Sequence, residues 1–153
     1  MKKLLATISV FVLLVILSSC FFLQPRDNYF GFSKKSFTVI EELDTHGGFL
    51  GDGSYYLILD CSDNPEAALK IVADWKQLPL SWNLKRIMYG SHNLSEEAHM
   101  PNIENGYYYF EDRHSKATDP SDDSDLFGRG SYNFSLAVYD ADTHRLYYFE
   151  FDT

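Results

Sequence analysis

The chain has 153 residues, and its 22 acidic side chains outnumber 13 basic ones, which gives a formal charge of −9 at pH 7. A chain of this length can bury the core of one domain without disulfide staples. The acidic surface argues against nucleic acid as a partner, because phosphates would be repelled, and against binding of anionic lipid headgroups by the domain body. Basic partners and divalent cations are compatible with this charge.

The first twenty residues have the composition of an export signal. Lys2 and Lys3 precede an almost wholly apolar run over residues 4–17, which is shorter than the roughly 20 residues of a membrane-spanning helix. The run ends in Leu17-Ser18-Ser19-Cys20, which resembles the lipobox cut by the bacterial lipoprotein signal peptidase. The resemblance implies that residues 1–19 are a signal peptide and that Cys20 is acylated. The mature chain would then keep 11 basic and 22 acidic side chains, a charge of −11.

Two other fates of this segment stay open. An uncleaved membrane helix would have to continue through Leu23 to reach about 20 apolar-rich residues, and an ordinary signal peptidase could cleave without lipidation. The lipoprotein interpretation places the chain on the extracytoplasmic face of a cell membrane, held by a lipid anchor with two or more acyl chains. It also leaves Cys61 without a disulfide partner, and we interpret this cysteine as a small buried hydrophobe.

Residues 20–36 show no regular periodicity, and we predict that they tether a single domain over residues 37–153 to the membrane. Three aromatic side chains of this segment, Tyr29, Phe30 and Phe32, are candidates to dock part of it onto the fold. The domain is predicted to begin with two strands, over residues 37–43 and 54–61, that form a hairpin.

A helical pattern follows the predicted hairpin. Asn64 is a favourable N-cap, and Pro65 suits the first position of a helix. Apolar residues recur at helical spacing over 68–78, and Pro79 is predicted to end the helix. A second helix is predicted between Ser81 as its cap and Gly90 as its stop.

Three further strands are predicted in the last third of the chain, over residues 106–112, 132–138 and 146–151. A polar loop over 113–130 separates the first two, and a turn over 140–144 makes the last two a hairpin. The predicted order is therefore β-β-α-α-β-β-β. This order indicates an α+β domain, with a mostly antiparallel sheet of about five strands and one or two helices packed on one face.

The glycine-rich segment 46–53 is the most unusual local feature, with four glycines in eight residues. Glycines permit positive φ and a close approach by a ligand, which makes His46, Gly48 and Asp52 candidate ligand-binding residues. Asp44, His46 and Asp52 could also converge on zinc or another divalent metal. The alternative is a hairpin connection whose His and Asp side chains bond to local amides.

The segment 119–125 is dense in aspartate and serine. Calcium prefers six to eight oxygen ligands, and Asp119, Asp123 and Asp125 are weak candidates for such a site. The EF-hand pattern with a downstream glutamate is missing, so a solvated loop is the alternative.

Tyrosine and phenylalanine are abundant, with 11 and 12 copies. Paired tyrosines place rings on both faces of the predicted sheet, and a face that the helices leave open would expose Tyr107 and Tyr109. Rigid aromatic surfaces of this kind recognise proteins or stack on sugars. Cross-strand aromatic packing that stabilises the sheet is the alternative.

Five stretches together resemble a group of short exported proteins of Gram-positive bacteria that have no assigned function. They are residues 45–49, 51–53, 75–81, 106–110 and 147–152. The resemblance covers about residues 37–153. It implies no catalytic residues, but it favours a Gram-positive source and an anchor on the outer face of the cytoplasmic membrane.

No nucleophile, metal site or acid–base set reaches a recognisable spacing in this sequence. We therefore expect a membrane-anchored lipoprotein whose domain is a non-enzymatic binding module, with an envelope protein or a glycan as its partner. The alternative is an envelope enzyme, a metal-dependent hydrolase centred on His46 and Asp52. No cofactor is predicted, and calcium or zinc would enter only through the two aspartate-containing segments.

Overall fold

The computed structural model describes residues 27–47, 51–90, 92–114 and 117–153. Two residues with predicted roles, Cys20 and Gly48, lie outside these ranges. In the part of the chain that is described, no helix is both long enough and apolar enough to cross a membrane.

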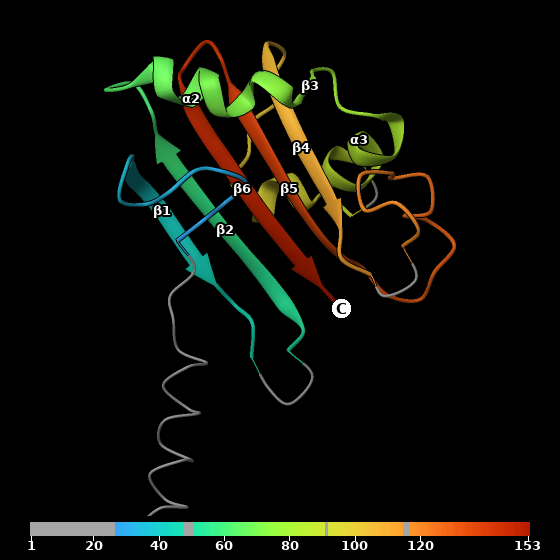
Figure 1. The fold of residues 1–153 in the computed structure, drawn as a ribbon. Coiled ribbons are helices and arrows are strands. Elements are labelled where there is room, and N and C mark those ends of the chain that lie inside the picture. The colour runs from blue at the N-terminus through green and yellow to red at the C-terminus, as the bar shows by residue number, and fades with distance from the viewer. Residues whose placement is uncertain (1–26, 48–50, 91, 115–116) are drawn as a thin grey trace, which may run out of the picture.

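A single six-stranded sheet forms the centre of the fold (Figure 1). Its strands lie in the order β1-β2-β6-β5-β4-β3, and each neighbouring pair is antiparallel. The strands are β1 (Thr38–Asp44), β2 (Gly53–Asp60), β3 (Lys76–Gln77), β4 (Gly106–Asp112), β5 (Asn133–Asp140) and β6 (Arg145–Asp152). The predicted α+β architecture with a mostly antiparallel sheet is confirmed, with one strand more than expected.

The additional strand explains where the first helix ends. The helix α2 (Pro65–Ile71) begins as predicted, because the side chain of Asn64 accepts a hydrogen bond from the backbone N–H of Ala67 at 3.3 Å. A 3₁₀ turn, η1 (Val72–Asp74), follows. The prediction that the helix continues to Leu78 was wrong, because β3 pairs with β4 instead. Pairing satisfies the backbone groups at this edge of β4, which helical periodicity alone does not reveal.

The second predicted helix is confirmed as α3 (Trp82–Tyr89). Ser81 caps it by accepting a hydrogen bond from the backbone N–H of Leu84 at 3.1 Å, and Gly90 follows its last residue. A short helical turn, α4 (Leu94–Glu97), comes next. Both helices contribute buried side chains to one hydrophobic cluster of the sheet.

Helices cover both faces of the sheet, and the expectation of one covered face was wrong. The helices α3 and α4 pack on the face that carries Leu136 and Val138. On the opposite face, α2 packs with Ala137 and Tyr139 in a second cluster (Figure 1). The reason is that the central strands are apolar on both sides, so each side must be removed from water.

The described part of the predicted tether, residues 27–36, contributes side chains to this second cluster. Tyr29 and Phe32 are almost fully buried, at 1% and 0% exposure. Their backbones exchange hydrogen bonds of 2.8 and 3.2 Å, which hold a tight turn against the sheet. The ring of Tyr29 meets Tyr148 edge-on at 5.0 Å, and Phe32 meets Trp75 at 5.7 Å. This turn and α2 together leave one end of the sheet face open.

Candidate binding pocket

A polar pocket of about 450 Å³ lies at the open end of the second face. Residues two apart on a strand share a face, so Glu150 and Asp152 of β6 both point to it. Tyr55 of β2 and Ser135 of β5 are the direct neighbours of Glu150 in the sheet register. The pocket is lined by Tyr29, Lys34, Glu42, Asp44, His46, Tyr55, Arg113, Glu150 and Asp152. These residues come from five separate segments of the chain.

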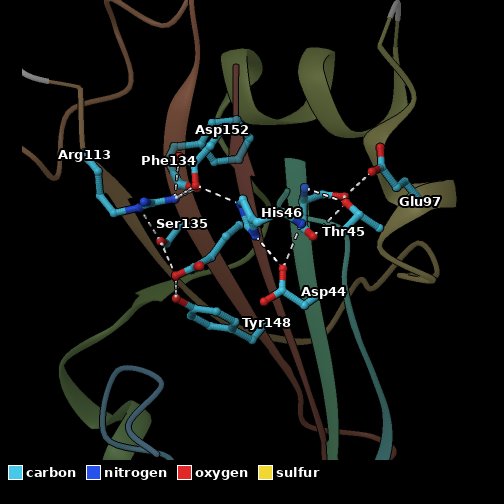
Figure 2. A network of polar contacts seen from close by, with 11 residues as sticks. Asp44, Thr45, His46, Glu97, Arg113, Phe134, Ser135, Tyr148 and Asp152 are labelled. Atoms are coloured by element: carbon cyan, nitrogen blue, oxygen red, sulfur yellow. Dashed lines mark hydrogen bonds and ion pairs between the residues drawn. The ribbon is translucent and has the colours of Figure 1, made fainter. Parts of the chain in front are cut away.

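Glu150 is a buried carboxylate among the residues that line the pocket, with only 5% exposure. The hydroxyl of Tyr148 donates a hydrogen bond to its Oε1 atom, and the hydroxyl of Ser135 donates to the same atom at 3.3 Å. Arg113 in turn donates from Nε to the hydroxyl oxygen of Ser135 at 2.9 Å (Figure 2). Burial of a carboxylate is costly unless hydrogen bonds stabilise it. This chain of donors meets that requirement and links the end of β4 to β6.

His46 lies between two carboxylates at the rim of the pocket (Figure 2). Its Nδ1 atom is 2.7 Å from Oδ1 of Asp44, and its Nε2 atom is 3.0 Å from Oδ2 of Asp152. Carboxylates only accept hydrogen bonds, so a ring nitrogen of His46 that carries a hydrogen donates it to the carboxylate that it faces. Asp152 also pairs with Arg113, whose Nη2 is 2.9 Å from Oδ1. The rim is therefore a continuous polar bridge from the end of β1 to the end of β4.

Another side of the pocket joins residues 27–36 to β1. The ammonium of Lys34 is 2.6 Å from Oε1 of Glu42 and 5.6 Å from the centre of the Tyr29 ring. The hydroxyl of Tyr55 lies 2.8 Å from both the Tyr29 hydroxyl and Glu42 Oε1. Burial alone would raise the pKa of Glu42, but the hydrogen bonds from Lys34 and Tyr55 hold it below its usual value. Burial and the same hydroxyl and carboxylate partners raise the pKa of Tyr55.

The structure places only part of the predicted glycine-loop site in the pocket. His46 and Asp44 line the pocket and contact each other, whereas Asp52 is exposed and its carbonyl accepts a hydrogen bond from the backbone of Gly47 at 3.4 Å. Gly48 lies outside the described residues. Asp152, the second partner of His46, is 106 residues away in the sequence. Among the described residues, no group of three or more His, Cys, Asp and Glu has the arrangement of a metal site.

The acidic segment 119–125 uses its side chains locally. Asp119 accepts hydrogen bonds from the backbone and the hydroxyl of Ser121 at 2.8 and 2.9 Å, and these bonds lower its pKa. Asp123 accepts a hydrogen bond from the hydroxyl of Ser81, the cap of α3. Asp125, the third candidate calcium ligand, is exposed on the same loop. The segment thus forms Asx turns and holds the N-terminus of α3.

The tyrosines are mostly covered. Tyr109 is exposed, at 39%, and its ring lies 4.4 Å from Phe30 and 5.8 Å from Trp75. Tyr107 is half-buried and packs against the second cluster. The turn over residues 27–36 and α2 therefore cover the sheet face on which the sequence allowed an exposed row of tyrosines.

Several residues of the pocket were missed by reasoning from the sequence. Arg113 is the first residue after β4, and Lys34 lies in the predicted tether. Glu150 and Asp152 alternate with aromatic residues on the closing strand, and acidic residues that share one face of an otherwise apolar strand are a usable signal. No local pattern indicates that the ends of β1, β4 and β6 meet at one place.

No family model, no curated protein sequence and no solved structure matches this chain.

Proposed function

We propose that this chain is an exported lipoprotein, held on the extracytoplasmic face of a membrane by acylation of Cys20, whose domain is a non-enzymatic binding module. Its ligand is a polar component of the cell envelope, and it binds in the pocket lined by His46, Arg113 and Glu150. The observation that carries the proposal is the pocket itself, a concave polar site assembled from five segments of the chain. Concave sites with a few converging polar groups are the usual form of a small-ligand site.

The contacts around the pocket support recognition of a ligand by a preformed site. Arg113 is held by Ser135 and Asp152, His46 by Asp44 and Asp152, and Lys34 by Glu42. Side chains that are already held lose little conformational freedom when a ligand binds. The pocket would therefore bind without extensive rearrangement of its walls.

The environment of His46 favours binding over hydrolysis. A general base or a zinc ligand needs a ring nitrogen directed at a reacting group or a metal. Both nitrogens of His46 are instead directed at carboxylates, at 2.7 and 3.0 Å. Asp52, the second residue of the proposed hydrolase centre, is not among the residues that line the pocket. We therefore prefer the binding module to the metal-dependent hydrolase.

The lipid anchor can be tested by metabolic labelling with an alkyne-tagged palmitate. The wild-type chain is expected to be labelled, and Cys20→Ser is expected to lose the label and leave the membrane fraction. Cys61→Ala is the matched control, because Cys61 is fully buried and burial, with the charge of Asp60, raises its pKa to about 12. Loss of label in the Cys61 variant, or retention in the Cys20 variant, would refute the anchor.

The pocket can be tested by photo-crosslinking in the native cell, with the full-length chain at the membrane. Gly47→p-benzoylphenylalanine places the crosslinker next to His46 at the rim and leaves every side chain of the pocket in place, because Gly47 is exposed and an added Cβ would meet no heavy atom closer than 3.8 Å. The same substitution at Glu66, which is exposed on α2 on the covered part of this face, is the control. We expect an adduct at position 47 that is absent at position 66. Identical products at the two positions, or none at position 47, would contradict the proposal.

A further inference from the structure

The balance of charge in the pocket indicates the sign of its ligand. Four carboxylates line it, those of Glu42, Asp44, Glu150 and Asp152. Against them stand two permanent cations, Lys34 and Arg113, together with His46. Carboxylates exceed cations even when His46 is protonated, and the whole chain has a charge of −9. The field of both the pocket and the molecule therefore attracts a cationic group.

One wall of the pocket already holds an ammonium group. The Nζ atom of Lys34 lies 5.6 Å from the centre of the Tyr29 ring and 2.6 Å from Oε1 of Glu42. The Tyr29 ring is stacked on Tyr55 at 5.9 Å, so two aromatic side chains stand beside the carboxylates. Aromatic faces and carboxylates together are the usual environment for binding an ammonium ion. Tyr29 and Tyr55 are buried, at 1% and 8% exposure, so an ammonium group supplied from outside would reach the carboxylates of the pocket and not the ring faces.

The remaining groups of the pocket suit hydroxyl-bearing ligands. Arg113 offers N–H donors, the four carboxylates offer acceptors, and the tyrosine hydroxyls can do both. Sugar hydroxyls donate and accept in the same way. A lysine side chain of a peptide would instead need an apolar channel for its four-carbon stem. The two tyrosines are the only residues with apolar rings in the lining.

From these observations we infer that the ligand is a glycan containing an amino sugar whose amino group is free and therefore carries a positive charge. The ammonium is bound by the carboxylates of the pocket, with Glu150 and Asp44 as counter-charges, and the hydroxyls are bound by Arg113 and the remaining acidic residues. This inference rests on the proposed function and deepens it, since it names the ligand class of the same pocket.

The experiment uses the full-length protein in detergent micelles at pH 6, with titration calorimetry as the readout. The probes are a β-1,4-linked glucosamine tetramer, its fully N-acetylated counterpart and trilysine. We expect the glucosamine tetramer to bind at least about tenfold more tightly than the acetylated tetramer, because charge-assisted hydrogen bonds are lost on acetylation. It should also bind more tightly than trilysine.

Three variants locate the binding. Glu150→Gln and Asp44→Asn are each expected to weaken binding of the glucosamine tetramer by about tenfold, since each removes one counter-charge and keeps the side-chain shape. Glu66→Gln, on α2 outside the pocket, should bind as the wild type does. Asp44 is exposed on β1, so Asp44→Asn decides the question even when replacement of the buried Glu150 impairs folding.

Equal affinity for the free and acetylated tetramers, tighter binding of trilysine, or no binding of the glucosamine tetramer would each overturn the inference. Wild-type affinity of Asp44→Asn for the glucosamine tetramer would do the same. A crosslinked adduct at position 47 together with any of these results supports the binding module and contradicts only the amino sugar as its ligand. Absence of that adduct removes the proposed function itself.

Discussion

Replacement of Gly106 by alanine is expected to lower the free energy of unfolding by about 3 kcal/mol or more. Gly106 begins β4 at a φ of +154°, and an added Cβ would lie 1.9 Å from the carbonyl oxygen of Tyr139. The colliding atom belongs to the backbone of β5, so no side chain can move aside. The carbonyl of Gly106 also accepts the hydrogen bond from Leu78 at 3.0 Å, which joins the edge strand β3 to β4. The strands on both sides would have to shift.

Thermal unfolding measures this effect, and the expected decrease in Tm is roughly 10 °C or more. Gly130→Ala is the matched control, because a Cβ at Gly130 would have no heavy atom within 4 Å. That substitution should change the free energy of unfolding by no more than about 0.5 kcal/mol. Similar stabilities of the two variants would show that β4 and β5 separate more easily at Gly106 than the structure indicates.

Replacement of Arg129 by methionine is expected to destabilise the fold by about 3–5 kcal/mol. Arg129 binds both carboxylate oxygens of Asp112, with Nη1 2.7 Å from Oδ2 and Nη2 3.1 Å from Oδ1. The side chain of Asp112 is only 2% exposed. Without Arg129 the carboxylate would stay buried at the end of β4 with its main counter-charge removed. Arg113, which lines the pocket, follows Asp112 directly in the sequence, so the Arg129 variant should also weaken ligand binding.

A double-mutant cycle in urea isolates this ion pair. Asp112→Leu combined with Arg129→Met removes both charges, and an apolar pair of similar size is tolerated better than a single buried charge. We expect the double variant to be more stable than Arg129→Met alone, with a coupling free energy of at least about 1 kcal/mol. Additive effects of the two substitutions would show that Asp112 reaches solvent or another donor when Arg129 is absent.

Local signals in the sequence predicted most elements of the fold. Asn64 and Ser81 each cap the helix that their position suggested, by accepting hydrogen bonds from Ala67 and Leu84. Alternation of apolar and polar residues, or enrichment in aromatic and branched residues, indicated the five longer strands within one or two residues of their bounds. Such signals are reliable because capping and strand alternation depend on residues a few positions apart.

The failures concern pairings between distant segments. Lys76 and Gln77 form an edge strand because β4 lies beside them, and their own sequence has no strand pattern. Coverage of both sheet faces follows from the apolar character of both sides of β2, β5 and β6, which indicates burial but not the element that supplies it. The sequence likewise does not show that residues 27–36 cover part of the second face.

The candidate site shows the same division. From the sequence, Asp44 and His46 are weak candidates for one metal site, and in the structure their side chains contact each other at 2.7 Å. The partner that completes the bridge, Asp152, is 106 residues distant, and Arg113 reaches it from the end of another strand. The predicted partner Asp52, six residues from His46, does not line the pocket.

The sequence by itself determined the α+β class, the order of most elements and the caps of the two main helices, because short-range backbone and side-chain preferences are sufficient for these. Only the tertiary structure decided that the ends of β1, β4 and β6 meet, that Glu150 is buried beneath hydroxyl donors, and that the turn over residues 27–36 supplies Tyr29 and Lys34 to the same pocket. The physical reason is that sheet register is set by the packing of both faces together, so it depends on the whole chain at once.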